Sequence, residues 1–263
     1  MVAFDAMSVD RFPAQADSSP ARDPLHGRRV AVTGGTAGLG LALVRELRSR
    51  GARVVFVARG RSGVERVERE LPGAYGVVGD VSRKDDIHPI ALQILGALGG
   101  VDVLINNASS LGPAQLELLA DTQCEDFERA LATNVLGPFR LTKALLGSLA
   151  GSAREGGGAV VLNVSSDAAF NAYPRWGAYA ASKAALHHLT GIWAEELKSD
   201  GVRFVSFDPG DMDTDLHRAA VPDADPLSLK QPQVAARELA DILRSALVNA
   251  PGTAQTPSGA FVR

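Results

Sequence analysis

A short strand that breaks into a glycine-rich turn and then into a helix is the stretch that most limits how this chain can fold. Residues 28–32 form a β-branched run, and residues 33–40 (TGGTAGLG) follow it as a turn. Leu41, Val44 and Leu47 then recur at the spacing of one helix face. Such a turn exposes backbone N–H groups at a helix N-terminus, where they and the helix dipole hold a pyrophosphate. The segment therefore predicts nucleotide binding, although a tight packing turn would have a similar pattern.

The spacing of the glycines narrows the type of nucleotide site. Gly34, Gly38 and Gly40 follow GxxxGxG, which differs from the GxGxxG fingerprint, and no GK[ST] ending marks a Walker phosphate loop. A second strand, residues 53–57, leads to Arg59 about twenty residues beyond the glycines, where an NAD site carries an acidic residue for the ribose 2′-hydroxyl. Because a guanidinium suits phosphate oxygens, Arg59 predicts a 2′-phosphate and hence NADP(H); the alternative is a solvated loop arginine.

The rest of the chain alternates strand and helix patterns, which predicts a single α/β domain over residues 25–263. We expect a doubly wound Rossmann-like fold with a mostly parallel sheet of six to seven strands and helices on both faces. Further strands are expected at residues 74–79, 101–105, 158–164 and 202–207, and helices at 62–71, up to 98, 178–198 and 234–248. A helical region over 122–149 should bend or break near Pro138.

Composition excludes several classes of partner. The net charge of −3, from 27 Lys and Arg against 30 Asp and Glu, gives no basic footprint for nucleic acid or for a membrane surface. The single cysteine, Cys124, cannot form an internal disulfide, which fits a cytoplasmic protein. His187 and His188 have no metal-spaced companion, so no metal is expected. Residues 1–24 contain no apolar run and are expected to be a flexible leader rather than a signal peptide or anchor.

Polar side chains stand where apolar ones would be expected. Asn106 and Asn107 directly follow the strand at 101–105, where they either tie neighbouring loops together or have a structural role only. Asn134 lies among apolar helical residues, so it is either a satisfied core amide or part of a site.

Tyr179 and Lys183 are four residues apart on a predicted helix, so their phenol and ammonium groups lie side by side. A cation about 4 Å from a phenol contributes roughly 4 kcal/mol at an effective dielectric of about 20. This energy corresponds to about three pKa units, so Lys183 is expected to lower the pKa of Tyr179 enough for proton transfer near neutral pH. The alternative is that both residues decorate a solvated helix.

Two segments are expected to wall a substrate pocket. Phe170, Tyr173 and Trp176 lie in a loop that either forms an aromatic wall or folds onto the core. Residues 211–231 form a long irregular stretch, which predicts a substrate lid.

The start of the predicted lid is acidic, with Asp211, Asp213 and Asp215 close to His217. Either Asp213 or Thr214 caps a following helix, or the carboxylates form a rim that favours a cationic substrate.

Taken in order, these motifs resemble the short-chain dehydrogenase/reductase family over about residues 27–250: the glycine turn at 33–40, Asn-Asn-Ala at 106–108, Asn134, Ser166, YxxxK at 179–183 and Pro-Gly at 209–210. The resemblance implies that Tyr179 is the general acid/base and that Lys183 lowers its pKa and holds the nicotinamide ribose. It also implies that Ser166 orients the substrate carbonyl and that Asn134 supports a proton-relay water.

The same resemblance implies the contacts of the dinucleotide and the substrate. Gly34, Gly38 and Gly40 would cradle the dinucleotide, with Leu39 near the nicotinamide and Asp80 and Val81 near the adenine. Further cofactor contacts are expected from Thr36, Arg59, Asn107, Ala108, Tyr179, Lys183, Pro209, Gly210, Met212 and Thr214. The substrate pocket is expected to include Ser109, Asp167, Phe170, Tyr173, Trp176, Asp211 and His217.

The sequence departs from the family pattern in three places. Ser109 replaces the usual glycine after Asn-Asn-Ala, which is similar to pteridine reductases, and the longer NNASSLGP is similar to sepiapterin reductases. Residues 258–263 lack the usual C-terminal Asp-Gly-Gly, which leaves open a seventh strand and the tetramer contacts made there. The leader is longer than usual.

These observations favour NADPH-dependent reduction of a carbonyl or C=N bond in a small molecule, by a homodimer or homotetramer. Two alternatives remain. The chain is a non-catalytic NADP(H)-binding sensor or scaffold, since fold does not settle function, or it is an alcohol dehydrogenase that runs in the oxidative direction.

Overall fold

The computed structural model describes residues 23–248 and 259–262. Within these residues, seven strands form one sheet in the order β3-β2-β1-β4-β5-β6-β7, and each neighbouring pair is parallel. The strands are β1 (Arg29–Thr33), β2 (Arg53–Ala58), β3 (Ala74–Val78), β4 (Val103–Asn106), β5 (Ala159–Val164), β6 (Val202–Phe207) and β7 (Phe261–Val262). The predicted doubly wound fold is confirmed, and the first six strands lie within two residues of their predicted bounds.

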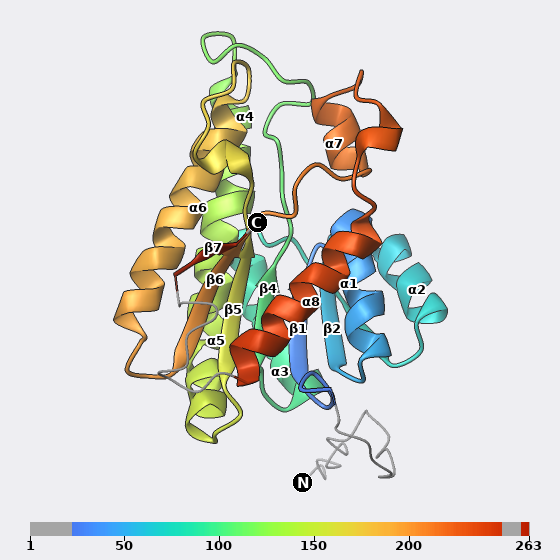
Figure 1. Ribbon diagram of the computed structural model, residues 1–263, viewed down its shortest axis with the longest axis vertical. Helices are drawn as coiled ribbons and strands as arrows, with labels where there is room; N and C mark the ends of the chain where they lie inside the picture. The colour runs from blue at the N-terminus through green and yellow to red at the C-terminus, as the bar shows by residue number, and fades with distance from the viewer. Residues whose placement is uncertain (1–22, 249–258, 263) are drawn as a thin grey trace, which may run out of the picture.

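Helices cover both faces of the sheet because successive strand side chains point to opposite sides. In β1, Val30 and Val32 belong to one apolar layer and Ala31 to the other. The first layer packs against α1 (Gly38–Ser49), α2 (Arg61–Glu70) and α8 (Pro232–Val248). The second packs against α3 (Lys84–Leu98), α5 (Gly137–Arg154) and α6 (Gly177–Glu196). In Figure 1, α8 crosses the near face of the sheet.

The strand order reverses between β1 and β4, which places a crevice at the carboxyl ends of these neighbouring strands. Buried amides hold this part of the sheet together. The Asn106 side chain donates to Asn163 Oδ1 of β5 at 2.8 Å, and Asn163 in turn donates to Thr190 Oγ1 of α6 at 2.9 Å. Asn106 is therefore structural, as one of its two interpretations held.

The predicted break in the helical region at 122–149 is confirmed, and it takes the form of a π-helical turn. α4 (Cys124–Leu131) runs into the π turn η1 (Ala132–Leu136), and α5 follows with Pro138 in its first turn. Proline has no backbone N–H, and in the first turn of a helix an N–H would have no partner within that helix. Pro138 is therefore tolerated at the start of α5.

The prediction of an irregular stretch at 211–231 is wrong. It contains the helix α7 (Asp215–Ala220) and a 3-10 turn, η3 (Pro226–Ser228). A backbone bridge between Met212 and Lys230 closes its base. The segment therefore projects as one folded flap beyond the carboxyl ends of the strands (Figure 1).

The structure describes only a part of each end of the chain. The predicted leader, residues 1–24, lies outside the described residues apart from Asp23 and Pro24. A seventh strand does form: the two-residue β7 pairs with β6. Along residues 23–248 and 259–262, no helix combines the length and the apolar character needed to cross a membrane.

Candidate active site

A cavity of about 440 Å³ opens at the carboxyl ends of the strands. It is walled by the turn after β1, by the segments that follow β2 to β6 and by α7. The residues of the sequence prediction that line it are Gly34, Thr36, Gly38, Leu39, Gly40, Arg59, Asp80, Val81, Asn107, Ala108, Ser109, Ser166, Asp167, Trp176, Tyr179, Lys183, Pro209, Gly210, Asp211, Met212, Thr214 and His217.

The glycine turn forms one end of the cavity and has no room for side chains. Gly34 and Gly38 have positive φ angles of 74° and 49°, which favour glycine. A Cβ on Gly40 would lie only 2.0 Å from the Gly34 carbonyl oxygen. Ala37, the N-cap of α1, makes no side-chain hydrogen bond to the first N–H groups of that helix. This helix end has the character of a phosphate site.

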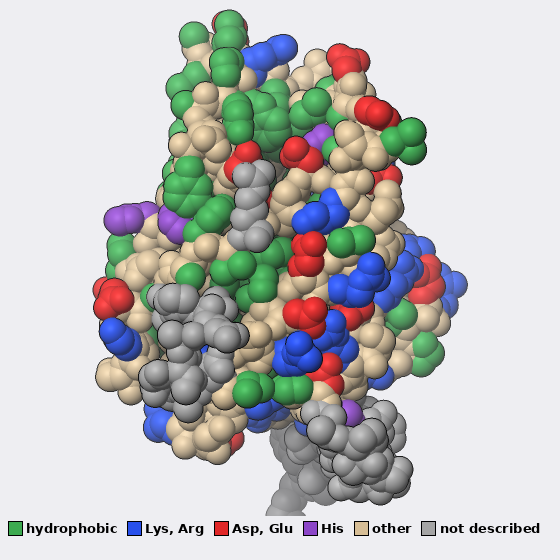
Figure 2. All heavy atoms as spheres, in the orientation of Figure 1, with side chains coloured by type: hydrophobic (Ala, Val, Ile, Leu, Met, Phe, Trp, Pro, Cys, Tyr) green, Lys and Arg blue, Asp and Glu red, His purple; other side chains and the backbone are tan. Residues whose placement is uncertain are grey.

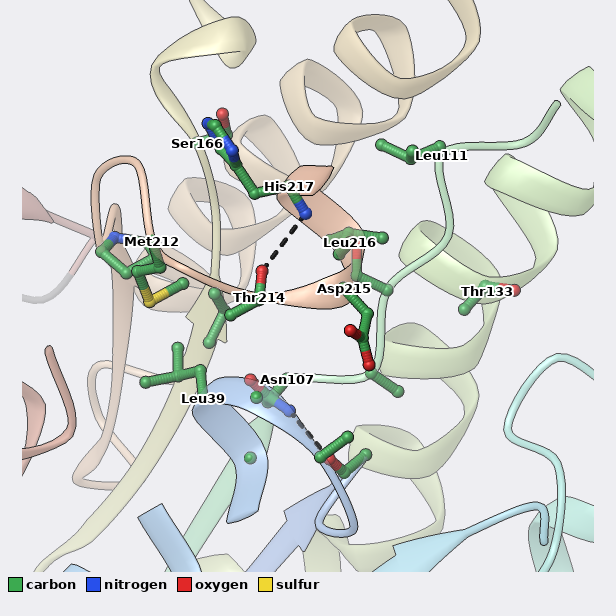
Figure 3. Close-up of a pocket in the computed structure, with 18 of the residues that line it drawn as sticks. Leu39, Asn107, Leu111, Thr133, Ser166, Met212, Thr214, Asp215, Leu216 and His217 are labelled. Carbon is green, nitrogen blue, oxygen red and sulfur yellow. Dashed lines mark hydrogen bonds between the residues drawn. The ribbon is translucent and has the colours of Figure 1, made fainter. Parts of the chain in front are cut away.

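Asn107 fixes the turn against the strand beside it. Its side chain donates to the Thr33 carbonyl oxygen at 2.9 Å, while Thr33 Oγ1 accepts the backbone N–H groups of Asn107 and Ala108, both at 3.0 Å. The loops after β1 and β4 are thus tied side by side on the cavity floor, where Figure 3 shows Leu39 and Asn107.

Tyr179 and Lys183 are both buried in the first two turns of α6, with 8% and 2% of their surfaces exposed. Lys183 Nζ donates to the Val164 carbonyl oxygen at 2.7 Å and lies 5.4 Å from the centre of the Tyr179 ring. The interpretation of these residues as decoration on a solvated helix is therefore wrong.

Burial shifts the pKa of Tyr179 in the direction opposite to the one predicted from the neighbouring Lys183. It raises the pKa of Tyr179 to about 12, a rise that hydrogen bonding with Ser166 opposes and the charge of Asp208 reinforces. Burial also lowers the pKa of Lys183 to about 8, against the effect of Asp208. The expectation that the pKa of Tyr179 lies below its usual value is wrong, because desolvation of the buried phenol outweighs the effects that lower its pKa.

Ser166 stands between Tyr179 and a carboxylate. Its hydroxyl oxygen lies 3.2 Å from Asp167 Oδ1 and accepts from Ala168 N at 3.2 Å, and its interaction with Tyr179 lowers the pKa of that phenol against the effect of burial. Ser109 lowers the pKa of Tyr179 more weakly, although its own hydroxyl makes no hydrogen bond of ordinary geometry within the described residues.

Asn134 does not line the cavity, and its predicted support of a proton-relay water stays a prediction. Its side chain is fully buried in the π turn behind the wall. Its amide donates to the Ser110 carbonyl oxygen at 2.7 Å and to Ser182 Oγ at 2.8 Å, and its Oδ1 accepts from Ser110 N at 2.8 Å. The side chain is thus a satisfied core amide that anchors the segment after Ser109.

Comparison with known proteins agrees with this geometry. The family model described as short chain dehydrogenase matches residues 28–225. The chain belongs to the short-chain dehydrogenase family. An uncharacterized oxidoreductase of Mycobacterium bovis is 35% identical over 250 residues, 91% of this chain and 69% of the relative. The L-fucose dehydrogenase of Mus musculus is 33% identical over 190 residues, 72% of this chain and 67% of the relative.

A solved structure of 3-ketoacyl-(acyl-carrier-protein) reductase from Brucella melitensis, complexed with NADH, has a similar fold. Its TM-score is 0.81 at 28% sequence identity, and the match covers 90% of this chain and 96% of that one.

Two predicted pocket residues of this short-chain dehydrogenase lie elsewhere. Phe170 packs edge-on against His187 and Phe261, with ring centres 4.6 Å away in each case, and so folds its loop onto α6 and β7. Tyr173 is also absent from the cavity wall. Of the three aromatic residues in the loop, only Trp176 lines the cavity, where its ring meets the Tyr179 ring edge-on at 5.7 Å.

The carboxylates at the acidic start of the flap are partly neutralised. Arg218 pairs with both Asp213 and Asp215, and His217 Nε2 lies 3.6 Å from Asp211 Oδ1. Thr214 caps α7 by accepting from His217 N at 3.2 Å, as one of the two interpretations held (Figure 3).

The cavity of this short-chain dehydrogenase also has walls that sequence reasoning missed. They are Ala37, Val57, Ala58, Gly60, Gly79, Thr133, Val164, Ser165 and Asp208. Leu111 also lines the cavity, and so do Asp215, Leu216 and Ala220, which fall within the segment 211–231 that was expected to wall it. Asp208 directly follows β6, so the rule that ligands lie at strand ends could have found it. Leu216 and Ala220 belong to α7, the helix that Thr214 caps. Among the described residues, no group of three or more His, Cys, Asp or Glu side chains could hold a metal ion.

Proposed function

We propose that this chain is an NADP(H)-dependent oxidoreductase that reduces a carbonyl or C=N bond of a small molecule, with Tyr179 as the general acid. The observation that carries the proposal is the buried Tyr179 hydroxyl. It lies in the cavity wall with Ser166 and Lys183, at the carboxyl ends of the strands.

The residues of the cavity suit a nicotinamide dinucleotide. The glycine turn at the N-terminus of α1 suits the pyrophosphate, and Lys183 suits the ribose beside Tyr179. When bound, the reduced dinucleotide supplies the hydride, which the protein's own residues cannot provide. Arg59 follows β2 and lines the cavity, and no carboxylate occupies that position. This favours a 2′-phosphate and hence NADP(H).

Tyr179 is protonated at neutral pH because burial raises its pKa to about 12. An alkoxide is roughly as basic as hydroxide, whose conjugate acid has a pKa of about 15.7. A phenol of this pKa therefore gives its proton readily to an oxygen that becomes an alkoxide. Ser166 can donate to the same oxygen, and both groups stabilise the negative charge that develops there.

The part of the cavity wall that lies beside Tyr179 is largely apolar. Leu111, Trp176 and Ala220 pack with Tyr179 in one small cluster, and Leu216 lines the same cavity. This supports a substrate with an apolar or aromatic body around the reacting carbonyl. The weaker resemblance to pteridine and sepiapterin reductases makes pterins one class to include in a substrate panel.

Alcohol oxidation is the second candidate, favoured by the similarity to a mouse protein named L-fucose dehydrogenase. In that direction Tyr179 would have to lose its proton first, which its raised pKa opposes at neutral pH. A non-catalytic NADP(H)-binding sensor or scaffold is the third candidate. Tight cofactor binding with no turnover across pterins, aromatic ketones, β-ketoacyl thioesters and amino-ketones would support it.

Tyr179→Phe tests the proposed acid directly. The variant should lose nearly all carbonyl-dependent NADPH consumption, by about a hundredfold or more, because a general acid contributes roughly 10²–10⁴-fold. Cofactor binding, followed by the fluorescence of bound NADPH, should be largely kept. Tyr75→Phe changes a tyrosine on β3 that does not line the cavity, and it is the matched control. A Tyr179→Phe protein with near-parental kcat would refute the proposal.

Arg59→Asp tests the choice of cofactor. The parent should show a higher kcat/KM with NADPH than with NADH, and the variant should lose this preference by tenfold or more, because a carboxylate repels a 2′-phosphate and accepts from a 2′-hydroxyl. Arg69→Asp makes the same charge change on α2, outside the cavity, and should leave the ratio unchanged. The similar Brucella structure contains NADH, so the cofactor preference of the parent protein has to be measured. A parent that prefers NADH would contradict the proposal that Arg59 binds a 2′-phosphate.

We also propose that residues 211–231 act as a lid, that the protein is a homodimer or homotetramer and that it works in the cytoplasm. The lid is supported by the bridge at its base and by α7 in the cavity wall. Light scattering of the purified protein would give the mass of the assembly.

A further inference from the structure

One arginine joins α2 to the turn that follows β1. Arg66, in the middle of α2, donates from Nη2 to the Thr36 carbonyl oxygen at 2.7 Å. Thr36 belongs to the glycine turn and lines the cavity, whereas Arg66 is not part of the cavity wall. The guanidinium therefore holds this carbonyl from outside the cavity.

Neighbouring contacts fix the Arg66 side chain. Its Nη1 donates to Glu70 Oε1 at 3.1 Å, and the other oxygen of that carboxylate accepts from Arg45 Nη2 of α1 at 3.1 Å. The first turn of α2 also lies against the glycine turn, since a Cβ on Gly63 would be 3.5 Å from Thr36 Cβ. In Figure 2, basic side chains gather on the side where Figure 1 places α1 and α2. One guanidinium and one carboxylate thus join both helices to the turn.

The glycine turn is held on two sides by side-chain donors. On the β4 side, Asn107 Nδ2 donates to the carbonyl oxygens of Thr33 at 2.9 Å and Gly34 at 3.4 Å. On the α2 side, Arg66 donates to the Thr36 carbonyl oxygen, and a hydrogen bond from a charged group is among the stronger ones. Because glycine leaves the backbone of the turn many conformations, these bonds select one arrangement of its peptide groups.

The direction of the Thr36 carbonyl matters for an anion in the cavity. In a trans peptide group the C=O and the N–H point in opposite directions, and the carbonyl oxygen carries a partial negative charge. A Thr36 carbonyl that turned into the cavity would therefore repel a phosphate. With this carbonyl held outside, a phosphate can meet the N–H groups at the start of α1, which no N-cap side chain occupies.

We propose that Arg66 is a positioning residue for the dinucleotide, because it holds the Thr36 carbonyl outside the cavity and so keeps the turn in the form that accepts phosphates. This rests on the proposed function for the ligand that the turn receives. Unlike Arg59, which lines the cavity, Arg66 acts through the turn and not on a 2′-phosphate. It should therefore matter equally for NADPH and for NADH.

The test measures the dissociation constants of NADPH and NADH by the fluorescence of the bound cofactor. In Arg66→Met the side chain keeps an apolar stem but the Thr36 carbonyl loses its donor, so both constants should rise by about tenfold. Their ratio should stay that of the parent, whereas Arg59→Asp should change it. At saturating NADPH, kcat should stay within about twofold of the parent while KM for NADPH rises, since the loss is one of cofactor binding.

Glu70→Gln is the matched control. It removes the ion pairs of that carboxylate but leaves the Arg66 guanidinium free to donate to Thr36. Arg69→Met is the second control, because it removes a guanidinium from the same helix at a residue outside the cavity wall. Both control proteins should bind NADPH and NADH as the parent does.

Hydrogen exchange followed by mass spectrometry tests the turn without any cofactor. The hydrogen-bonded amides around the turn are those of Gly34, Gly35 and Leu41. They should exchange faster in Arg66→Met than in the parent, because the turn has lost its contact with α2. Glu70→Gln should leave their exchange unchanged.

Unchanged cofactor affinity or unchanged exchange in Arg66→Met would overturn the proposal. So would an equal loss of affinity in either control, or a loss for NADPH alone, which would make Arg66 a ligand of the 2′-phosphate. Arg66→Gln repeats each measurement if Arg66→Met does not fold. A parent protein that binds neither NADPH nor NADH would contradict the proposed function, and faster exchange in Arg66→Met would still show that Arg66 holds the turn.

Discussion

At the scale of single residues, desolvation decides what the phenol and the ammonium of the cavity do. Tyr179 holds its proton more firmly than a free tyrosine, and Lys183 holds its proton less firmly than a free lysine. The pair therefore approaches its ligands as a protonated phenol beside an amine whose pKa, about 8, lies close to neutral pH. That state suits proton donation to a reduced carbonyl, which is the direction we propose.

The glycine turn has no room for a methyl group at position 40. In Gly40→Ala the new Cβ would meet the Gly34 carbonyl oxygen at 2.0 Å and Asn107 Nδ2 at 2.6 Å, so the turn must shift. We expect a loss of roughly 1–3 kcal/mol in the unfolding free energy. NADPH affinity should fall at least about tenfold, a loss of about 1.4 kcal/mol in binding, as measured by fluorescence titration.

Gly96→Ala is the matched control, because it is also a helical glycine and a Cβ there meets nothing within 4 Å. It should bind NADPH as the parent does and gain up to about 1 kcal/mol in stability. Equal NADPH affinity in Gly40→Ala and the parent would show that the turn does not form the dinucleotide site.

At the scale of elements, the Asn134 side chain joins the π turn to the segment that follows Ser109 in the cavity wall. Asn134→Leu keeps the volume but leaves the backbone N–H and C=O of Ser110 without their partner. With each unsatisfied buried group costing about 1–3 kcal/mol, the unfolding free energy should fall by roughly 3 kcal/mol in urea titrations. Turnover should fall too, because the segment that carries Ser109 loses its anchor. Asn171→Ala, at an exposed loop position, should change the unfolding free energy by less than about 0.5 kcal/mol.

The elements also show what the sequence could reveal. Strands that are almost wholly apolar, such as residues 159–164 with Asn163 as their polar side chain, can be recognised from the sequence because a buried parallel strand needs no polar side. α7 could not be found in this way, since it is six residues long and has no buried residue to give it a period. The position of the Phe170 side chain depends on contacts with α6 and β7, which are distant in sequence, so it could not be predicted from the residues around it. The pKa of Tyr179 depends on its burial, which spacing on a helix does not give.

At the scale of the whole molecule, the end of the sheet opposite the cavity is held by one buried carboxylate. Asp102 accepts from Arg29 Nη2 at 2.6 Å and from Arg29 N at 2.8 Å, and it also accepts from Ser152 of α5. These bonds join β1, α5 and the residue before β4. Burial by itself would raise the pKa of Asp102, but the hydrogen bonds from Arg29 and Ser152 outweigh it and hold the pKa below its usual value.

Stability should therefore depend on pH through Asp102. A carboxyl whose pKa is lower in the folded state stabilises that state fully above its unfolded pKa, and the contribution is lost as pH falls through the folded pKa. Asp102→Asn should lower the unfolding free energy by about 2 kcal/mol at pH 7, because it weakens charge-assisted hydrogen bonds. The difference from the parent should shrink as pH falls from about 5 toward 3. Asp200→Asn, which removes an exposed carboxylate, should stay within about 0.5 kcal/mol of the parent. Urea unfolding at several pH values measures all three proteins, and a difference between Asp102→Asn and the parent that does not change with pH would mean that the carboxylate's charge does not stabilise this end of the sheet.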